Sequence, residues 1–347
     1  MKVIKEKVGN IGKKEIFLFT LQNNNGIKVS FLNYGGRITS MMAPDKFGKF
    51  EEIILGYNKI SEYLDDTAYL GAICGRVAGR IKNGSFFLDG QKICVTKNDG
   101  AHHLHGGIHN FSTSIWEVEV LSTESRAKVR LFYKSEDKEE GYPGEVEVSA
   151  YYELDENNKL TITYKGQTTA KTLLNLTNHT YFNLSGMLKN DILNHFLQID
   201  SDHVLELDNE ALPTGHLLNV EKTPFDLKYK KCLAHQILQN HKQLLLARNG
   251  YNHPFVLSQS FNQEIVLSEE ISGRKLVVET DSPCVVVYTS SYFDDDFLIK
   301  DKPAKYLGIC LETQGFPDAI NHGNFPSIVL DKDESYYAKT TYTVGLV

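Results

Sequence analysis

The sequence predicts an all-β protein, folded as a large antiparallel β-sandwich with one or two short helices. Roughly seventeen short runs have the composition and alternation of strands. Turn residues separate most of these runs, and only residues 233–247 show a clear helical period. Because no Pro-, Gly- or Ser-rich linker divides the 347 residues, we expect a single domain over residues 1–347.

The strand candidates extend along the whole chain. The first two, 16–22 and 27–40, are separated by Asn23-Asn-Asn-Gly26, which is a turn signal. Apolar and polar residues alternate in 145–154, as in a strand with one buried face. The other candidates are 52–56, 92–96, 115–121, 127–134, 159–165, 173–184, 195–200, 254–258, 264–267, 275–280, 284–290, 306–313, 327–330 and 336–346.

Charge and hydrophobic pattern narrow the classes of partner. The net charge of −7 argues against nucleic acid and against an anionic membrane surface. No apolar run approaches the length of about 18 residues that a spanning helix needs, and the first residues lack the apolar stretch of a secretory signal. The five cysteines form no Cys-x-x-Cys pair, and three Asn-x-Ser/Thr sequons crowd onto 175–185. We therefore expect a cytoplasmic protein with reduced thiols.

The predicted strand 173–184 has two different faces. With a period of two, Asn175, Thr177, His179, Tyr181 and Asn183 point one way, and leucine and phenylalanine occupy most of the other side. His179 is therefore the single ionisable group in the centre of a polar face. Two interpretations stay open, a histidine exposed on a solvated sheet and a histidine presented to a ligand.

The predicted strand 306–313 and its continuation to residue 315 repeat this design around Glu312. Gly308, Cys310, Glu312 and Gln314 share one face, and Gly308 would leave room for a molecule to approach the sheet. If this strand and the one that carries His179 belong to one sheet, an imidazole and a carboxylate face one cleft. Such a pair suits proton transfer near neutral pH. No Gly-x-Ser-x-Gly elbow indicates a covalent nucleophile.

Three further clusters contain candidate binding residues. Arg76 and Arg80, flanked by glycines, could hold an anion or hydroxyl groups with their forked donors, or could be ordinary surface arginines. Asn252 lies in Gly250-Tyr-Asn-His-Pro-Phe255, a rigid loop that enters a strand. The third cluster contains four histidines.

The histidine cluster, His102, His103, His105 and His109, raises the question of a metal site. No carboxylate at suitable spacing accompanies the four side chains, and Gly106-Gly107 indicates a tight turn, so we expect no metal. His105 is the member that the turn would present as a hydrogen-bond donor. The other three are expected on a loop surface.

Together these motifs resemble the aldose 1-epimerases (galactose mutarotases). The matching segments occur in the family's order between about residues 30 and 345, and eight in register are far more specific than any one of them. They are Arg76-Val-Ala-Gly-Arg-Ile81, Leu104-His-Gly-Gly107, Gly141-Tyr-Pro-Gly144, Asn178-His-Thr-Tyr-Phe-Asn-Leu184, Thr223-Pro-Phe-Asp226, Gly250-Tyr-Asn-His-Pro-Phe255, Leu311-Glu-Thr-Gln314 and Phe316-Pro-Asp-Ala-Ile-Asn321.

The resemblance implies a fold and a reaction. The fold is the family's β-supersandwich, and the reaction interconverts the α- and β-anomers of aldohexoses such as glucose and galactose. Glu312 would be the base at the C1 hydroxyl and His179 the acid at the ring oxygen. His105 and Arg80 would bind sugar oxygens, and Arg76 would have a structural role. No cofactor or metal would be required, and the protein would be a monomer or weak homodimer.

One position departs from the family's pattern. Asn252 stands where the family usually carries the aspartate that binds a sugar hydroxyl. A neutral hydrogen bond then replaces a charge-assisted one, at a loss of about 1 kcal/mol. A hexose-6-phosphate epimerase, a non-catalytic sugar-binding protein and a glycoside hydrolase remain as alternatives, although the last would need a second carboxylate.

Overall fold

The computed structural model describes residues 1–294 and 296–347. In this part of the chain the strands pair antiparallel, and two short helices are present, α1 (Leu233–Ile237) and α2 (Lys242–Leu246). The predicted all-β class is confirmed. The helix predicted over 233–247 is divided in two because His241 has extended backbone angles. Short 3₁₀ helices occupy Ile60–Tyr63, Lys82–Gly84, Phe111–Thr113, Glu139–Gly141 and Ala319–Asn321.

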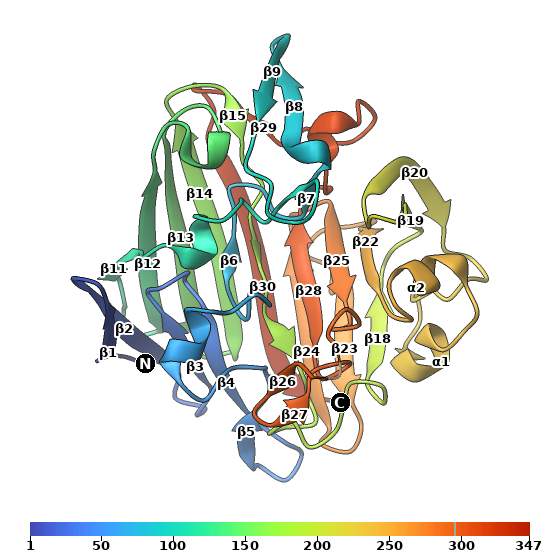
Figure 1. Cartoon of the computed structure of the whole chain (residues 1–347). Coiled ribbons are helices and arrows are strands. Elements are labelled where there is room, and N and C mark those ends of the chain that lie inside the picture. Colours follow the sequence, from blue (N-terminus) through green and yellow to red (C-terminus); the bar gives the residue numbers. More distant parts are fainter. Residues whose placement is uncertain (295) are drawn as a thin grey trace.

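The largest sheet has nine strands in the order β11-β12-β13-β14-β30-β24-β23-β18-β21. Figure 1 shows β11 to β14 at the left of the molecule, with β30 running through its centre. The bounds are β11 (Glu117–Val120), β12 (Arg126–Ser135), β13 (Val146–Asp155), β14 (Lys159–Thr168), β30 (Tyr336–Leu346), β24 (Arg274–Thr280), β23 (Ile265–Glu269), β18 (Phe196–Ile199) and β21 (Lys231–Cys232).

The second sheet has six strands in the order β17-β28-β25-β22-β19-β20. Helix α2 contacts β19 of this sheet, and α1 contacts β21 at the edge of the nine-stranded sheet; both helices lie at the right of the molecule (Figure 1). The bounds are β17 (Tyr181–Phe182), β28 (Ile309–Gln314), β25 (Cys284–Tyr288), β22 (Asn252–Val256), β19 (His203–Leu207) and β20 (Pro213–Asn219).

A third sheet takes the first five strands in sequence order and lies against β12 and β13 (Figure 1). Its strands are β1 (Lys2–Ile11), β2 (Lys14–Gln22), β3 (Lys28–Leu32), β4 (Ile38–Pro44) and β5 (Phe50–Glu52). Five two-stranded pairs complete the strands: β6 (Ile73–Cys74) with β16 (Thr177–Asn178), β7 (Arg80–Ile81) with β10 (His103–Leu104), β8 (Ser85–Leu88) with β9 (Gln91–Cys94), β15 (Thr172–Leu173) with β29 (Val329–Leu330), and β26 (Leu298–Ile299) with β27 (Lys302–Pro303).

The nine-stranded and six-stranded sheets share one hydrophobic core. Val287 of β25 and Leu311 of β28 are opposite one another in register and point into it. They meet side chains of the larger sheet such as Leu276, and the rings of Phe182 and Tyr342 lie 5.6 Å apart across the interface. Full burial of a side chain of this size contributes about 1.5–3 kcal/mol. Since Leu311 faces this core, its two neighbours on β28 face the opposite side of the sheet.

The predicted strand over 173–184 is not continuous. It consists of β15, β16 and β17, and each of these short strands pairs with a different partner. Every side chain from 172 to 186 is buried, so the polar face is not solvated. Asn175 hydrogen-bonds with its side chain to both N–H and C=O of Gly315, and Asn183 donates to the carbonyls of Asn190 and Leu307. The interpretation of His179 as a solvent-exposed surface residue is therefore wrong.

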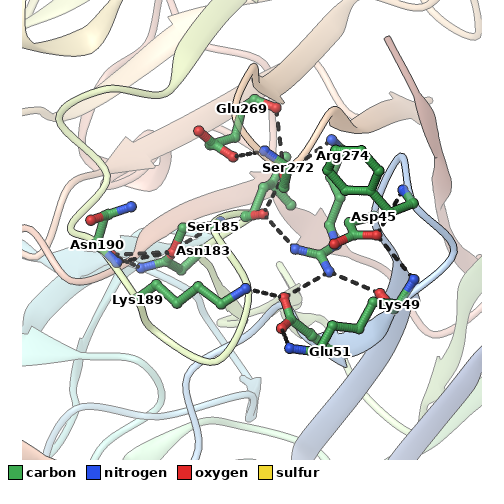
Figure 2. Close-up of polar contacts among 12 residues, drawn as sticks. Asp45, Lys49, Glu51, Asn183, Ser185, Lys189, Asn190, Glu269, Ser272 and Arg274 are labelled. Carbon is green, nitrogen blue, oxygen red and sulfur yellow. Dashed lines mark hydrogen bonds and ion pairs between the residues drawn. The ribbon is translucent and has the colours of Figure 1, made fainter.

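An ionic network centred on the buried Glu51 and Arg274 joins β5 to β24, as Figure 2 shows. The Glu51 carboxylate accepts from Arg274 at 3.1 Å and from Lys189 at 2.5 Å, and Lys49 lies 2.7 Å from its second oxygen. Arg274 also donates to the carbonyl of Leu184. Burial alone would raise the pKa of Glu51, but the three cationic partners lower it to about 2. The network fixes the loop after β17 against two sheets.

Helix length also bears on the membrane question. In the described ranges, the structure contains no helix with the length and apolar character to cross a bilayer.

Candidate active site

All five site residues predicted from sequence line one cavity of about 360 Å³. Strands β28, β25 and β22 form its floor, and segments around residues 69 and 105 lie on its other sides. The residues are Arg80, His105, His179, Asn252 and Glu312. They are separated by up to 232 positions in sequence (80 to 312), so folding alone brings them together.

The floor of the cavity follows from the register of the six-stranded sheet. Glu312 of β28 is opposite Val286 of β25, and Cys310 is opposite Tyr288. Tyr288 is in turn opposite Asn252 of β22. Residues opposite one another in a sheet share a face, so the carboxylate, thiol, phenol and amide all point to the same side.

Gly308 does not have the role expected from sequence. A Cβ atom at this position would lie 2.8–2.9 Å from side-chain atoms of Leu55 and Tyr181. Glycine is therefore required by the packing of these neighbours, and the space above it is already filled.

His179 lies between β16 and β17 and is 5% exposed. Its backbone is fixed on both sides, since its N–H donates to the carbonyl of Ala72 and its C=O accepts from Gly71, each at 2.9 Å. Its Nε2 atom lies 3.5 Å from Oε1 of Glu312, and its Nδ1 lies 3.4 Å from Sγ of Cys310. The imidazole is thus held between two residues of one strand.

Burial shifts the two ionisable groups in opposite directions. It lowers the pKa of His179 to about 4. It raises the pKa of Glu312 to about 8, although the positive charge of Arg80 acts to lower that pKa. Desolvation disfavours the charged form of each group. Between these two values the pair holds one proton, which Glu312 carries while His179 is neutral. Transfer of that proton across the 3.5 Å gap would create a carboxylate and an imidazolium.

His105 is held by a turn, as the sequence predicts. Its φ is +49°, and its Nδ1 accepts a 3.3 Å hydrogen bond from the N–H of Gly79. Gly106 is required next to it, because a Cβ there would lie 1.9 Å from the carbonyl oxygen of Gly75. Burial keeps the pKa of His105 well below its usual value, so the ring is neutral. With Nδ1 as acceptor, the ring proton lies on Nε2, which makes His105 a donor toward the cavity.

The structure also brings together a set of potential metal ligands that the sequence did not indicate. His105, His179 and Glu312 offer one ligand atom each within 4.8 Å of one another. A metal ion needs an imidazole lone pair, whereas the Gly79 hydrogen bond places a proton on Nε2 of His105. A metal would therefore have to break that hydrogen bond, so the donor set fits an ion poorly.

The remaining predicted candidates divide between the cavity and the core. Nε of Arg80 donates to Asp99 at 2.7 Å at the cavity wall. Arg76 is buried elsewhere and donates to Ser135 and to the carbonyls of Glu136 and Gly144, which fits the structural role that the resemblance implies.

The expectation that His102 and His103 lie on a loop surface is wrong. Both are buried: His103 contacts the Tyr142 hydroxyl at 2.7 Å, and His102 accepts from the N–H of Asn83. Each ring satisfies a polar group of the fold that would otherwise be unpaired, which explains its burial. His109 is exposed, as expected.

Tyr69, which lines the cavity opposite the sheet, was not predicted as a site residue. Its ring centroid lies 4.7 Å from that of His105 and 6.0 Å from that of His179. Its backbone is left-handed, with φ of +56°. The segment is held by Asp66, which accepts from the N–H groups of Ala68 and Leu70 and forms a buried ion pair with Arg37. No motif or periodicity marks this loop, because its partners are distant in sequence.

The family model for aldose 1-epimerase matches residues 18–343. The chain belongs to the aldose 1-epimerase family. It is 36% identical to galactose mutarotase of Bos taurus over 330 residues, which cover 94% of this chain and 93% of that one. It is 31% identical to an aldose 1-epimerase of Streptococcus thermophilus, with 99% and 98% covered. The crystal structure of galactose 1-epimerase from Lactobacillus acidophilus superposes with a TM-score of 0.90 at 28% identity and covers 99% of each chain.

These similarities confirm the family and the fold expected from sequence. As an aldose 1-epimerase, the protein is an isomerase that acts on carbohydrates. The members of this family act at the anomeric carbon of a sugar.

Proposed function

We propose that this aldose 1-epimerase interconverts the α- and β-anomers of aldohexoses such as glucose and galactose, with Glu312 and His179 as the catalytic acid–base pair. The observation that supports this proposal is the buried carboxylate and imidazole, 3.5 Å apart, at the floor of a cavity. One group must remove a proton while the other supplies one, and the two must reach neighbouring oxygens of one sugar.

The reaction balances with this pair alone. Glu312, as carboxylate, takes the proton of the C1 hydroxyl, and His179, as imidazolium, gives the Nε2 proton to the ring oxygen. The bond between C1 and the ring oxygen breaks, which leaves an open-chain aldehyde. Rotation about the C1–C2 bond and reclosure with the roles reversed give the other anomer. The neutral pair and the ion pair contain the same proton, so one internal transfer prepares the site for catalysis.

The other cavity residues would bind and orient the sugar. His105 offers its Nε2–H, and Arg80 offers guanidinium donors beside Asp99. Asn252 offers an amide that both donates and accepts. Tyr288 and Tyr69 provide apolar faces on which a sugar ring can lie.

Polarimetry tests this proposal. Fresh α-D-glucose or α-D-galactose should reach its equilibrium rotation faster with micromolar protein than in buffer. Glu312→Gln and His179→Asn should each lower kcat at least about a hundredfold, since each removes one partner in proton transfer. Survival of activity in either variant would contradict the assignment of that residue. Rates equal to those in buffer for the unmodified protein would favour a non-catalytic sugar-binding role.

Two related activities are less consistent with the cavity. A hexose-6-phosphate epimerase needs a basic phosphate site, but Arg80 is the single lysine or arginine among the described residues that line the cavity, and it pairs with Asp99. We expect a higher KM for glucose 6-phosphate than for glucose. A glycoside hydrolase needs a second free carboxylate, whereas Asp99, the second carboxylate of the described lining, is bonded to Arg80.

A further inference from the structure

The thiol of Cys310 contacts Nδ1 of His179. Its Sγ lies 3.4 Å from that nitrogen, and both residues are buried. Cys310 precedes Glu312 by two positions on β28, so the thiol and the carboxylate project from the same face of the strand. One strand therefore contacts both ring nitrogens of the histidine, one through a sulfur and the other through a carboxyl oxygen.

A neutral imidazole has two tautomers, and only one of them suits the proposed reaction. If the proton is on Nε2, this nitrogen cannot accept the proton of Glu312, and a proton lost from it would leave an imidazolate. If the proton is on Nδ1, the lone pair of Nε2 faces Glu312 and can accept its proton. The partner of the other nitrogen decides which tautomer forms.

We propose that the sulfur of Cys310 accepts the Nδ1–H of His179 and thereby keeps Nε2 unprotonated and directed at Glu312. Cys310 is then a positioning residue, which acts on the reaction only through His179. The inference rests on the proposed function, in which His179 receives a proton from Glu312 and gives it to the ring oxygen. The proton moves from the Glu312 carboxyl to Nε2. The other ring proton remains bonded to Nδ1 and hydrogen-bonded to the sulfur throughout.

The proposed reaction requires this direction of the hydrogen bond, and the neighbouring groups are compatible with it. Tyr181 is opposite Cys310 in register. Its hydroxyl donates to the carbonyl of Ala68 at 2.8 Å. Burial and the nearby Glu312 raise the pKa of the Cys310 thiol well above its usual value, so the sulfur carries no charge. Tyr181 and Tyr288 flank Cys310 on the two neighbouring strands and leave it buried.

The weakness of sulfur as an acceptor fits this role. A carboxylate at the position of Cys310 would stabilise the imidazolium and hold the proton on His179. A neutral sulfur accepts weakly, so it can select the tautomer without fixing the charge. His179 can therefore release its Nε2 proton to the ring oxygen in the opening step and take a proton back at Nε2 in the reclosure step.

Nitrogen-15 NMR of the histidine rings tests the inference directly, on the full chain without sugar at pH 6–7. His179→Asn assigns the signal by its disappearance. The proposal predicts the Nδ1–H tautomer for His179 and the Nε2–H tautomer for His105. An Nε2–H tautomer at His179 would overturn it. This readout does not depend on activity, so a failure of the tautomer and a failure of the proposed reaction can be told apart.

Kinetics of Cys310 variants provide the second test. Cys310→Ala removes the acceptor and should lower kcat about three- to tenfold, the effect of one weak hydrogen bond, with little change in KM. Cys310→Ser keeps an acceptor and should recover most of the loss. Cys284→Ala is the matched control, because Cys284 is an equally buried thiol that donates instead to the carbonyl of Gln314. An unchanged kcat in Cys310→Ala, or equal losses in the alanine and serine variants, would overturn the inference.

Discussion

The ionisation of His179 and Glu312 is inverted relative to that of the free side chains. A histidine with a pKa of about 4 and a glutamic acid with a pKa of about 8 are neutral together over the physiological range. The catalytic ion pair is then a minor form that a bound sugar can stabilise with its hydroxyl groups. The arrangement keeps one proton in the site, where it can serve either oxygen of the substrate.

This single shared proton predicts the pH dependence of catalysis. Above the pKa of Glu312, near 8, the pair loses its only proton and cannot donate to the ring oxygen. Below the pKa of His179, near 4, both groups are protonated and no base is left. We therefore expect kcat/KM, measured by polarimetry and corrected for the rate in buffer, to be flat between about 4 and 8 and to fall on either side. A rise of activity through pH 9 would contradict the shared-proton model.

Asn252 allows a prediction about the affinity for the sugar. Its neutral amide lies on the cavity floor beside Tyr288, where the resemblance to the family leads one to expect a carboxylate. Asn252→Asp should strengthen one hydrogen bond to a sugar hydroxyl and lower KM for glucose or galactose by up to about tenfold. Gln259→Glu adds the same charge on an exposed loop and serves as control. An unchanged KM in Asn252→Asp would show that Asn252 does not bind the sugar.

At the scale of elements, alternation along the sequence identified correct faces but not correct strands. His179 and Tyr181 both line the cavity, as their spacing predicts. The segment breaks into β15, β16 and β17 because each pairs with a different distant partner, and pairing of that kind leaves no local signal. Strands β1 and β20 were not predicted, since most of their residues are exposed or only partly buried. Strand β19 was not predicted because its buried residues Val204 and Leu205 are adjacent and interrupt the alternation.

The loop that carries Tyr69 could not be predicted for a related reason. Its position depends on Asp66, whose partner Arg37 lies 29 positions away on the N-terminal side. Neither residue belongs to a motif, and both charges are buried, which composition does not reveal. The candidate catalytic pair, in contrast, lies in segments whose residue types and order are characteristic of the family.

Asp66→Asn tests whether this buried pair positions the cavity wall. The variant leaves the Arg37 guanidinium buried without its counter-charge, which costs about 3–5 kcal/mol. We expect a lower Tm and, at temperatures where the variant is folded, a higher KM, because Tyr69 loses its fixed support. Arg126→Gln breaks the exposed pair with Glu153 and should change neither quantity. A lower Tm with normal KM would mean that the pair stabilises the fold without positioning Tyr69.

For the whole molecule, the two large sheets have different roles: both form the core, and the six-stranded sheet also carries residues of the cavity. The nine-stranded sheet buries its inner face against the shared core. The six-stranded sheet buries one face in that core and presents Cys310, Glu312 and Asn252 on the other. The strand count and turn signals were enough to predict a sandwich, but the division of strands between sheets depends on long-range pairing such as β14 with β30.

The Glu51 network links this architecture to stability in acid. Its folded pKa of about 2 lies below the ordinary value of 4.5, so its contribution is complete above pH 4.5 and is lost as the pH falls toward 2. Glu51→Gln leaves the fully buried Arg274 without its counter-charge and should lower the free energy of unfolding by about 3 kcal/mol at pH 7. The difference in Tm between the two proteins should shrink steadily from pH 4.5 to pH 2.

Glu15→Gln, in the exposed pair with Lys7, is the control and should behave like the unmodified protein. A Tm difference that stays constant with pH would show that the charge of Glu51 does not stabilise the fold, and that the loss comes from packing alone.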